Sequence, residues 1–332
     1  MADSTPPTIR DLARELNVSH TTVSRVLNGK GGAFISDATR RRVLDAAARR
    51  NYRPHRFARA LATGRTGMVV LWAQTLRQPY AVNIMNQVLD QMSDPSCELV
   101  IRTMRQLDAY PYGIAHWQVD GILALDGVDV LQHVMVLGQG SGPPIVAMGD
   151  PPGIPVDHVG VDLRAGAVEA TRHLIEAGCR RIAFFTNTWG NRPDEGRYAG
   201  YLSVMREAGR APEIIVLTGE KRASARVALR TYIEREGHPD GLLCLSDDIA
   251  IGAYSAIRDL HLRIPDDIAV VGCDGLEEDE YLEPPLTTIM QPFDQMAAVA
   301  WQFLRQRMEN RSLPIQTCVL SPQLVVRASS QH

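Results

Sequence analysis

The sequence lacks the features that would place it in a membrane or in an oxidising compartment. No apolar run reaches the roughly 18 residues that a membrane-spanning helix needs. Residues 1–7 lack the basic-then-apolar pattern of a secretory signal. The five cysteines stand singly, without a C-x-x-C pair or zinc-ligand spacing: Cys97, Cys179, Cys244, Cys273 and Cys318. We therefore expect a cytoplasmic chain with buried thiols, no metal site and no membrane partner.

Motifs of the common enzyme classes are missing as well. There is no P-loop, no G-x-S-x-G and no H-E-x-x-H, and the glycine pair at residues 64–67 is too close to cradle a phosphate. Asp247 and Asp248 are two carboxylates, as a glycosidase would need. Adjacent side chains on one loop point in different directions, however, and nothing sets the separation that such chemistry requires. The sequence predicts neither an enzyme nor a cofactor.

The charge of the chain is unevenly distributed. The net charge is −3, yet residues 1–65 hold 13 Lys and Arg against 5 Asp and Glu, which leaves the remainder with 22 against 33. A basic segment ahead of an acidic body is typical of a DNA-binding head on a soluble domain. A merely solvated charged surface is the other interpretation.

Two short helices joined by a tight turn are predicted at residues 8–27. Apolar residues of the first recur at the spacing of one helical face: Ile9, Leu12, Ala13 and Leu16. Thr8 can cap this helix, Asn17-Val18 forms the turn, and Ser19 is a second candidate cap. The second helix buries Val23, Val26 and Leu27, ends at Asn28-Gly29 and leaves His20, Thr21, Ser24 and Arg25 outside. A helix-turn-helix places such a polar face in the major groove of DNA, although two packed helices without a DNA role would show the same pattern.

Residues 8–61 resemble the headpiece of the lac-repressor (LacI/GalR) family of transcription regulators. The matching segments are residues 8–13, 18–19, 22–28, 36, 39–40, 43–44, 52–54 and 58–61. The resemblance implies that His20, Thr21 and Arg25 read bases in the major groove. It implies further DNA contacts, several of them to phosphates, by Thr8, Ser19, Thr22, Ser24, Asn28 and Ala58.

A third helix is expected over about residues 37–51, with Ser36 as its cap. We expect its core face to consist of Val43, Leu44, Ala47 and Ala48, while five arginines lie outside: Arg40, Arg41, Arg42, Arg49 and Arg50. These arginines either bind phosphates or form a solvated face. The preceding loop, residues 29–35, is about two residues longer than the family pattern, and we expect Phe34 or Ile35 to pack against the head.

Residues 53–66 are predicted to form a linker with a short hinge helix. Pro54 suits its first turn and Gly64 its end. The resemblance implies that two such helices, one per subunit, enter the minor groove, where Leu61 wedges between base pairs and kinks the DNA. Ordinary packing of Leu61 within a linker is the alternative.

From residue 67 onward, short apolar runs alternate with helical patterns. Strands are expected at 68–72, 99–101, 121–125, 144–148, 182–185, 214–217, 241–245 and 269–272, and helices at 81–92, 164–177, 198–208, 224–234 and 249–260. Buried parallel strands with βαβ crossovers fit this pattern. We expect an all-α headpiece (residues 1–52), a hinge (53–66) and a two-lobed, periplasmic-binding-protein-like α/β body (67–332). Its N-lobe would hold about 67–160 and 291–320, and its C-lobe about 161–290 and 321–330.

An effector would bind beyond the carboxyl ends of these strands. Family resemblance assigns effector binding to Arg197, Asp247 and Asp274, and the polar loop after the strand at 241–245 adds Ser246. Tyr80 and Trp189 offer aromatic faces for an apolar sugar face. The N-lobe carboxylate of the family is displaced by one position, to Asp150, with Gly149 in its place. Each polar residue has an alternative role in a salt bridge or cap; Asp247, for example, could cap the helix near Ile249.

Together these observations predict a cytoplasmic, sequence-specific transcription regulator, most simply a repressor. It would bind a palindromic double-stranded DNA operator as a homodimer, because one head reads only a half-site. A small sugar-like effector would control it from the interlobe cleft. No leucine-heptad helix follows Arg327, so we expect no tetramer by that route. An effector-independent DNA-binding protein is the alternative function, and a solute-binding protein is a more distant one.

Overall fold

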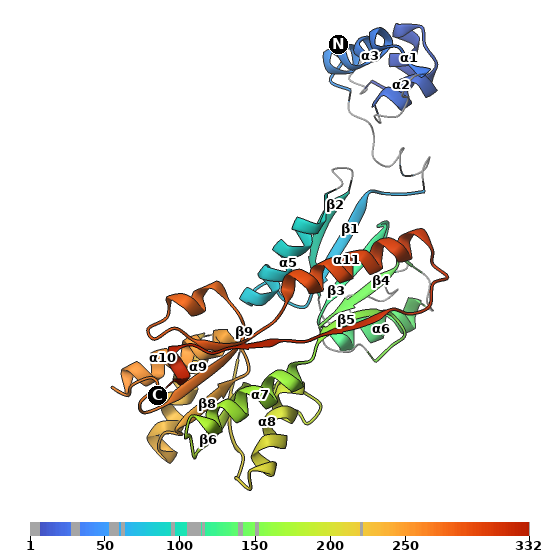
Figure 1. The fold of residues 1–332 in the computed structure, drawn as a ribbon. Coiled ribbons are helices and arrows are strands. Elements are labelled where there is room, and N and C mark those ends of the chain that lie inside the picture. The colour runs from blue at the N-terminus through green and yellow to red at the C-terminus, as the bar shows by residue number, and fades with distance from the viewer. Residues whose placement is uncertain are drawn as a thin grey trace. The chain divides into compact units, whose positions relative to one another are not determined.

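The computed structural model describes residues 7–27, 34–52, 60, 64–93, 97–104, 114, 117–138, 142–149, 153–219 and 222–331. The chain divides into two units, Met1–Gly67 and Met68–His332, each of which is described by itself (Figure 1). In the described part, no helix has the length and apolar content to cross a membrane.

The first unit is a three-helix head made of α1 (Ile9–Leu16), α2 (His20–Leu27) and α3 (Asp37–Arg49). Its core consists of Leu12, Ala13, Leu16, Val23, Val26, Val43, Ala46 and Ala47. At the start of α1, Asp11 N–H donates to Thr8 Oγ1 at 3.3 Å and Thr8 N–H donates to Asp11 Oδ2 at 2.9 Å, which is a capping box. Asn17 closes α1 in the left-handed conformation, with φ of 52°. The predicted helix-turn-helix is confirmed.

The core face predicted for α3 was partly wrong. Leu44 is 47% exposed and Ala48 is also exposed, whereas Ala46, which the prediction omitted, is fully buried. Positions 43, 46 and 47 lie on one helical stripe, and position 44 is rotated about 100° away from 43 toward solvent. Of the two candidates in the preceding loop, Ile35 packs against the core and Phe34 is 95% exposed.

The N-lobe of the second unit is a six-stranded parallel sheet in the order β11-β5-β4-β3-β1-β2. Its strands are β1 (Met68–Ala73), β2 (Glu98–Thr103), β3 (Gly121–Leu125), β4 (Ile145–Met148), β5 (Asp157–Val161) and β11 (Thr317–Leu320). Helices α5 (Pro79–Gln91) and α11 (Phe293–Glu309) cover one face, where Leu71 and Trp301 share a core. Helix α6 (Val128–Gly138) covers the other face, against Trp72.

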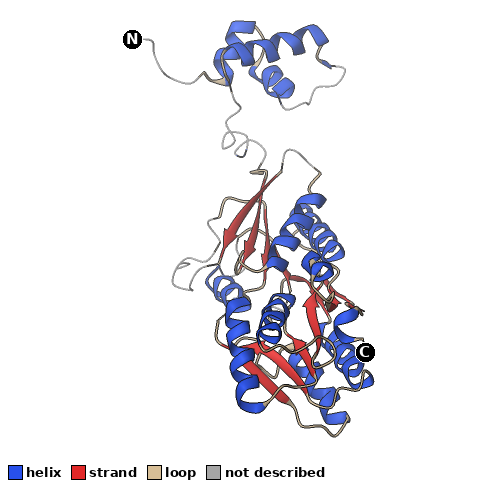
Figure 2. Ribbon diagram, turned by 90° about the vertical axis from the view of Figure 1, so that its left-hand side faces the viewer, coloured by secondary structure: helices blue, strands red, loops and turns tan. Residues whose placement is uncertain are grey.

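The C-lobe is built in the same way around the order β12-β10-β9-β8-β6-β7. Its strands are β6 (Ile182–Asn187), β7 (Glu213–Leu217), β8 (Gly241–Cys244), β9 (Ala269–Asp274), β10 (Thr287–Met290) and the antiparallel β12 (Gln323–Val325). Its helices are α7 (Leu163–Glu176), α8 (Gly196–Glu207), α9 (Arg222–Glu236) and α10 (Asp247–Asp259), with two short 3₁₀ segments, η3 (Glu277–Tyr281) and η4 (Ala328–Ser330). The helices flank the strands on both sides (Figure 2).

The chain passes between the lobes three times: after β5, after β10 and after β11. Parallel strands followed by crossover helices turn their carboxyl ends toward the same side of a sheet. The predicted head with a two-lobed α/β body is therefore confirmed as the fold. Elements that the sequence analysis did not specify are α6, β5, β10, α11 and the edge strands β11 and β12.

Candidate functional site

A cavity of about 160 Å³ lies between the two lobes of the body. Its polar lining comes from residues at or just after the carboxyl ends of strands: Gln74, Asp126, Asn187, Ser246, Asp248, Asp274 and Gln291. Arg197, at the start of α8, adds a guanidinium. Tyr80 and Trp189 add aromatic rings, one from each lobe. A lining of polar and aromatic side chains is suited to a small molecule that has both hydroxyl groups and apolar faces.

Arg197 lies in the cavity wall and is held in one orientation. Its Nε donates to Glu195 Oε1 at 2.8 Å and its Nη1 to the Leu245 carbonyl at 2.8 Å. Glu195 in turn accepts from the backbone N–H of Tyr198 at 2.8 Å and caps α8. Burial alone would lower the pKa of the guanidinium, but Glu195, Cys273 and Asp274 more than offset this, so its pKa is raised. The charge of Arg197 is therefore permanent and largely neutralised by Glu195.

Asp274 ends β9 and is 4% exposed. Its backbone φ of 141° is unusual for a residue with a side chain. Gln291 Nε2 donates to its Oδ1 at 2.9 Å, which orients the carboxyl group. Burial, and then the nearby Asp247 carboxylate, raise the pKa of Asp274 well above its usual value, while Arg197 lowers it. Carboxyl groups with raised pKa values occur both in functional sites and in buried networks of charged side chains.

Trp189 is 41% exposed at the cavity, and the Arg192 guanidinium lies 4.9 Å from its ring centroid. Tyr80 lies near the start of α5 and is partly buried. Ser246 caps α10 by accepting from Ile249 N–H at 3.3 Å, so its hydroxyl has a structural role as well as a place in the cavity lining. These three predicted residues are thus brought together with Arg197 and Asp274.

The structure does not place Asp247 in the cavity, which corrects the sequence-based assignment. Asp247 is fully buried, and its carboxylate accepts from Gly275 N–H at 2.6 Å, Leu276 N–H at 3.2 Å and Thr288 Oγ1 at 2.7 Å. It therefore holds the loop after β9 in place from within the core of the C-lobe. Nor does Asp247 cap α10, because Ser246 does so. Asp150, Asn28, Ala58 and Leu61 lie outside the described residues.

Sequence reasoning did not assign several polar residues that line the cavity, among them Asp126, Asn187 and Gln291. Asp126 directly follows the buried strand β3, and Asn187 is the last residue of β6. A polar residue at the carboxyl end of a buried parallel strand was the available signal for both. Gln291 follows β10, a strand that the apolar pattern did not specify.

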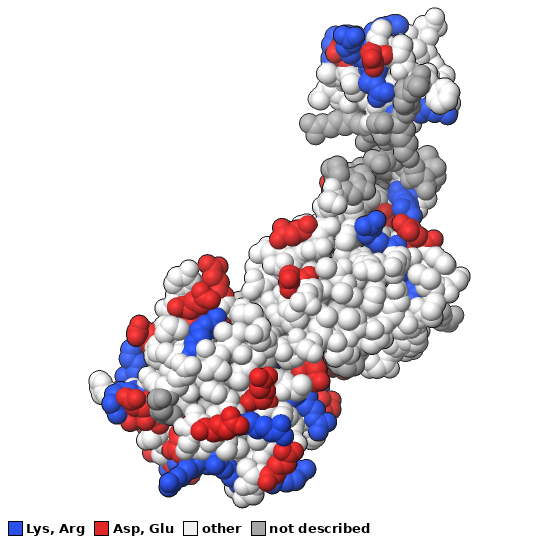
Figure 3. Space-filling model, viewed as in Figure 1, with Lys and Arg blue, Asp and Glu red and all other residues white. Residues whose placement is uncertain are grey.

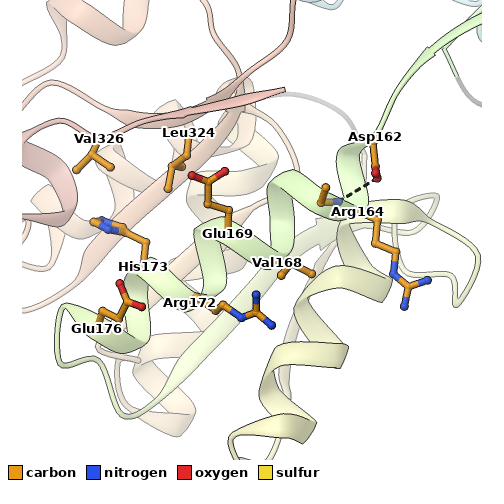
Figure 4. A pocket seen from close by; sticks show the side chains of 10 residues that line it. Asp162, Arg164, Val168, Glu169, Arg172, His173, Glu176, Leu324 and Val326 are labelled. Atoms are coloured by element: carbon orange, nitrogen blue, oxygen red, sulfur yellow. Dashed lines mark hydrogen bonds between the residues drawn. The ribbon is translucent and has the colours of Figure 1, made fainter. Parts of the chain in front are cut away.

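A larger open groove, of about 640 Å³, lies on the C-lobe along α7, next to β12 (Figure 4). Arg164, Glu169, Arg172 and Glu176 line it with charges of both signs. Arg172 pairs with Glu207 at 3.0 Å and His173 hydrogen-bonds Ser330 Oγ at 2.7 Å, so these polar groups are used within the lobe. This groove lies along one edge of the sheet rather than at the carboxyl ends of its strands.

In the head, the exposed face of α2 carries His20, Thr21 and Arg25. Ser19 Oγ accepts from Thr22 N–H at 3.0 Å and caps this helix. Three of the five arginines in or directly after α3 bind other residues of the head. Arg50 and Arg49 pair with Glu15 at 2.8 and 3.6 Å, and Arg42 Nη2 donates to the Leu16 carbonyl at 3.1 Å. These contacts hold α3 against α1.

Comparison with known proteins identifies both parts of the chain. Residues 8–55 match the lacI family of bacterial regulatory proteins, and residues 171–330 match a periplasmic binding protein-like domain. The ribose operon repressor of Haemophilus influenzae is 32% identical over 328 residues, which cover 97% of this chain and 98% of that protein. The chain belongs to the lacI family. Members of this family are DNA-binding transcription regulators, and this chain is one of them.

Solved structures agree with this assignment of the fold. A lac repressor dimer bound to operator and the anti-inducer ONPF has a TM-score of 0.85 at 23% identity and covers 99% of this chain and 100% of that one. A complex of the transcriptional regulator CelR with cellobiose has a TM-score of 0.69 at 28% identity, with 97% and 99% covered. Among the described residues of this family member, no group of three or more His, Cys, Asp or Glu is arranged to hold a metal ion.

Proposed function

We propose that this lacI-family chain is a homodimeric repressor that binds a palindromic operator and is controlled by a neutral, sugar-like effector between its lobes. The observation that carries the effector part is the interlobe cavity, whose polar lining converges from the strand ends of both sheets. A ligand that contacts both lobes stabilises one relative arrangement of them. It can then change DNA affinity through its differential affinity for the two arrangements.

The chemistry of the lining favours a neutral ligand with hydroxyl groups. Asp126 and Asp274 are acceptors for hydroxyl hydrogens, and Gln74 and Asn187 both donate and accept. Asp248 also lines the cavity but pairs with Arg222. Arg197, the cation in the wall, already pairs with Glu195, so it offers little net charge to a phosphate. Relatives in the comparisons include a ribose operon repressor and a regulator solved with cellobiose, which is consistent with this class of ligand.

For DNA, we propose that His20, Thr21 and Arg25 contact base edges, whereas Ser19, Thr22 and Ser24 contact phosphates. The exposed position of the first three on α2 supports this division. Thr8, Asn28, Ala58 and Leu61 keep their proposed DNA contacts from the family resemblance. We also keep residues 1–52, 53–66 and 67–332 as the proposed head, hinge and body, and we infer that the protein acts in the cytoplasm, where its DNA target is.

A surface on the N-lobe supports the dimer. Val82 and Leu89 of α5 are 37% and 45% exposed and, with the partly buried Met85, form an apolar stripe on the outer side of that helix. Figure 3 shows few charged side chains over the region of α5 and α11, in contrast to the charges of both signs over the C-lobe. Leu89→Glu should yield monomers in sedimentation analysis, whereas Val136→Glu, on the exposed face of α6, should leave dimers.

The effector is tested by thermal shift of the full chain against sugars, sugar phosphates, sugar acids, polyols and nucleosides. A ligand at 100 times its Kd stabilises the folded state by about 2.7 kcal/mol and raises Tm. Trp189→Ala should abolish or weaken a genuine hit, because it removes an exposed cavity wall without emptying the core. Val227→Ala, a change at a residue 64% exposed on α9, is the control.

A hit is then added to a DNA-binding assay with duplexes selected from a random pool. A change in operator affinity supports effector control. Unchanged operator affinity with every hit, or no hit in the whole panel, would favour the alternative of an effector-independent DNA-binding protein. Failure to select any duplex would contradict the proposal that the chain is a sequence-specific repressor.

A further inference from the structure

Asp126 and Gly149 occupy adjoining strand ends in the N-lobe and are matched in shape. Asp126 follows β3, and Gly149 follows β4, the neighbouring strand. A Cβ atom built on Gly149 would lie 2.2 Å from Asp126 Oδ1. Any larger residue at position 149 would therefore displace the Asp126 carboxyl group. The glycine leaves open the place that this carboxyl group fills in the cavity wall.

The backbone holds Asp126 in this place. Asp126 N–H donates to the Met148 carbonyl at 3.0 Å, and Gly149 N–H donates to the Val159 carbonyl at 3.0 Å. Asp126 has a φ of 55° and Gly149 a φ of 100°, both in the left-handed region. Such conformations are uncommon for residues with a side chain and tend to persist where the surrounding structure requires them. The two consecutive left-handed residues Asp126 and Gly127, at 55° and 71°, turn the chain sharply between β3 and α6.

Asp274 lies at the corresponding place in the C-lobe. It ends β9, and its carboxyl group is oriented by Gln291. The charge of Asp126 contributes to raising the pKa of Asp274, after burial and the effect of Asp247, so the two carboxyl groups are near enough to interact electrostatically. Both line the same cavity, one from each lobe.

We propose that Asp126 is the N-lobe specificity residue of this cavity, paired across it with Asp274. The two carboxyl groups select an effector that presents hydroxyl groups to both lobes, and the Asp126 carboxylate rejects its anionic analogues. This inference rests on the proposed function and deepens it, because it assigns the ligand class to a particular pair of residues.

The physical reason for selection is the asymmetry of the hydrogen bonds that a carboxylate can make. An ionised carboxylate accepts hydrogen bonds but cannot donate them. It therefore binds a hydroxyl donor favourably and repels a phosphate or a second carboxylate. Hydrogen bonds to charged groups are stronger than neutral ones. The substitution Asp126→Asn keeps the shape of the side chain and removes its charge. It therefore distinguishes an effect of charge on ligand selection from an effect of packing.

The test is calorimetric titration of the full-length chain with D-ribose, D-glucose, cellobiose, D-ribose 5-phosphate and D-gluconate. The variants are Asp126→Asn and, as a matched control, Asp129→Asn, an exposed aspartate three residues further along the same lobe. We expect Asp126→Asn to weaken binding of the preferred neutral sugar by about 10- to 100-fold, the range of a charged hydrogen bond. We expect the variant to lose at least about tenfold of the discrimination against the anionic sugars, as removal of one like charge requires. Asp129→Asn should behave as wild type.

Small-angle scattering provides a second measurement on the same samples. The preferred sugar should make the wild-type body more compact, and Asp126→Asn should require a higher sugar concentration for the same change. A thermal unfolding curve of each variant shows whether it is folded, and Asp126→Ser is the replacement if the asparagine variant is not.

The results that would overturn the inference differ from those that would overturn the proposed function. Unchanged affinity and unchanged selectivity in folded Asp126→Asn, with a sugar that binds the wild type, would contradict the role of Asp126 alone. Preference of the wild type for an anionic sugar would contradict charge selection while leaving an effector cavity. Absence of binding by any compound of the panel to the wild type would contradict the sugar-like effector of the proposed function, and this inference with it, before a variant is compared.

Discussion

The carboxyl groups of Asp279 and Asp247 face each other in the interior of the C-lobe, and both residues are fully buried. Asp247 already accepts from two backbone N–H groups and Thr288. Neither carboxyl oxygen of Asp279 has a hydrogen-bond donor in the described structure. Burial, and then the charge of Asp247, raise the pKa of Asp279 to about 9. Asp279 is therefore protonated at neutral pH, and its hydroxyl hydrogen can be donated to Asp247.

Stability should consequently fall as the pH rises. The ordinary pKa of an aspartate is 3.8, so between roughly pH 4 and pH 9 the folded chain keeps a proton that the unfolded chain releases. The contribution of this proton to the free energy of unfolding is complete below pH 3.8. It is lost as the pH rises through about 9, the pKa of Asp279 in the folded chain. One such proton corresponds to at most about 1.4 kcal/mol of unfolding free energy per pH unit.

Asp279→Asn tests this relationship. The amide N–H₂ can donate to Asp247 without a titratable proton, so the variant should melt at a higher temperature than wild type at pH 8. Its stability should also depend less steeply on pH between 5 and 9. Urea unfolding across this range provides the measurement, with exposed Asp266→Asn as control. A wild-type stability that is flat from pH 5 to 9 would mean that Asp279 is ionised in the folded state.

The ion pair of Arg307 with Asp157 should be essential for the N-lobe. Arg307 Nε and Nη2 donate to the two oxygens of Asp157 at 2.9 and 2.6 Å, and the Asp157 side chain is 1% exposed. Arg307→Ala leaves that carboxylate buried without its partner, which costs about 3–5 kcal/mol in comparable cases. Urea denaturation measures the loss. Arg305→Ala, an exposed change on the same helix, should cost less than about 0.5 kcal/mol.

Arg25 should contribute to sequence discrimination by the head. It is exposed on α2 in the position proposed to contact base edges. Arg25→Ala should cost about 1–3 kcal/mol of discrimination between the selected operator and one altered at the contacted base pair. Fluorescence anisotropy at fixed salt measures both affinities. Arg235→Ala, an exposed change on the body, is the control, and equal loss on all DNA sequences would instead indicate a phosphate contact.

Leu61→Ala should weaken specific DNA binding far more than non-specific binding. Leu61 lies outside the described residues, and this prediction follows from the hinge sequence and the family resemblance. An apolar wedge acts only where the DNA is kinked at the centre of an operator. Parallel titrations with the selected operator and with random duplex provide the comparison. Equal loss of both affinities would contradict the role of Leu61 as a wedge between base pairs.

Much of the fold could be predicted because local patterns and tertiary packing agree. The apolar spacing of Leu12 and Leu16 and the capping residue Thr8 define α1 before any packing is considered. The runs at β3, β6 and β9 are buried on both faces, as continuous apolar strands should be. Strand β5, with its mixed sequence Asp-His-Val-Gly-Val, escaped prediction because its two polar residues are buried with partners on other segments. Asp157 pairs with Arg307, 150 residues away in the sequence, and the His158 ring hydrogen-bonds the Gly149 carbonyl.

The candidate site could be predicted in outline only. Arg197, Asp274, Trp189, Tyr80 and Ser246 line the cavity, as the positions after strands indicated. Asp247 does not line it, because the backbone N–H groups of Gly275 and Leu276 donate hydrogen bonds to its carboxylate. Which of two adjacent aspartates faces the cavity depends on the first turn of α10, and sequence spacing does not reveal that.

By itself, the sequence determined the kind of protein: a helix-turn-helix head, a two-lobed α/β body and membership of the lacI family. These follow from periodicity, capping and motif order, which are local properties of the chain. Only the tertiary structure decided that Asp247 is internal, that Asp279 lies against it, and that Asp126 fills the space beside Gly149. The physical reason is that burial, pKa and steric fit depend on neighbours brought together from distant segments, and no local pattern encodes those neighbours.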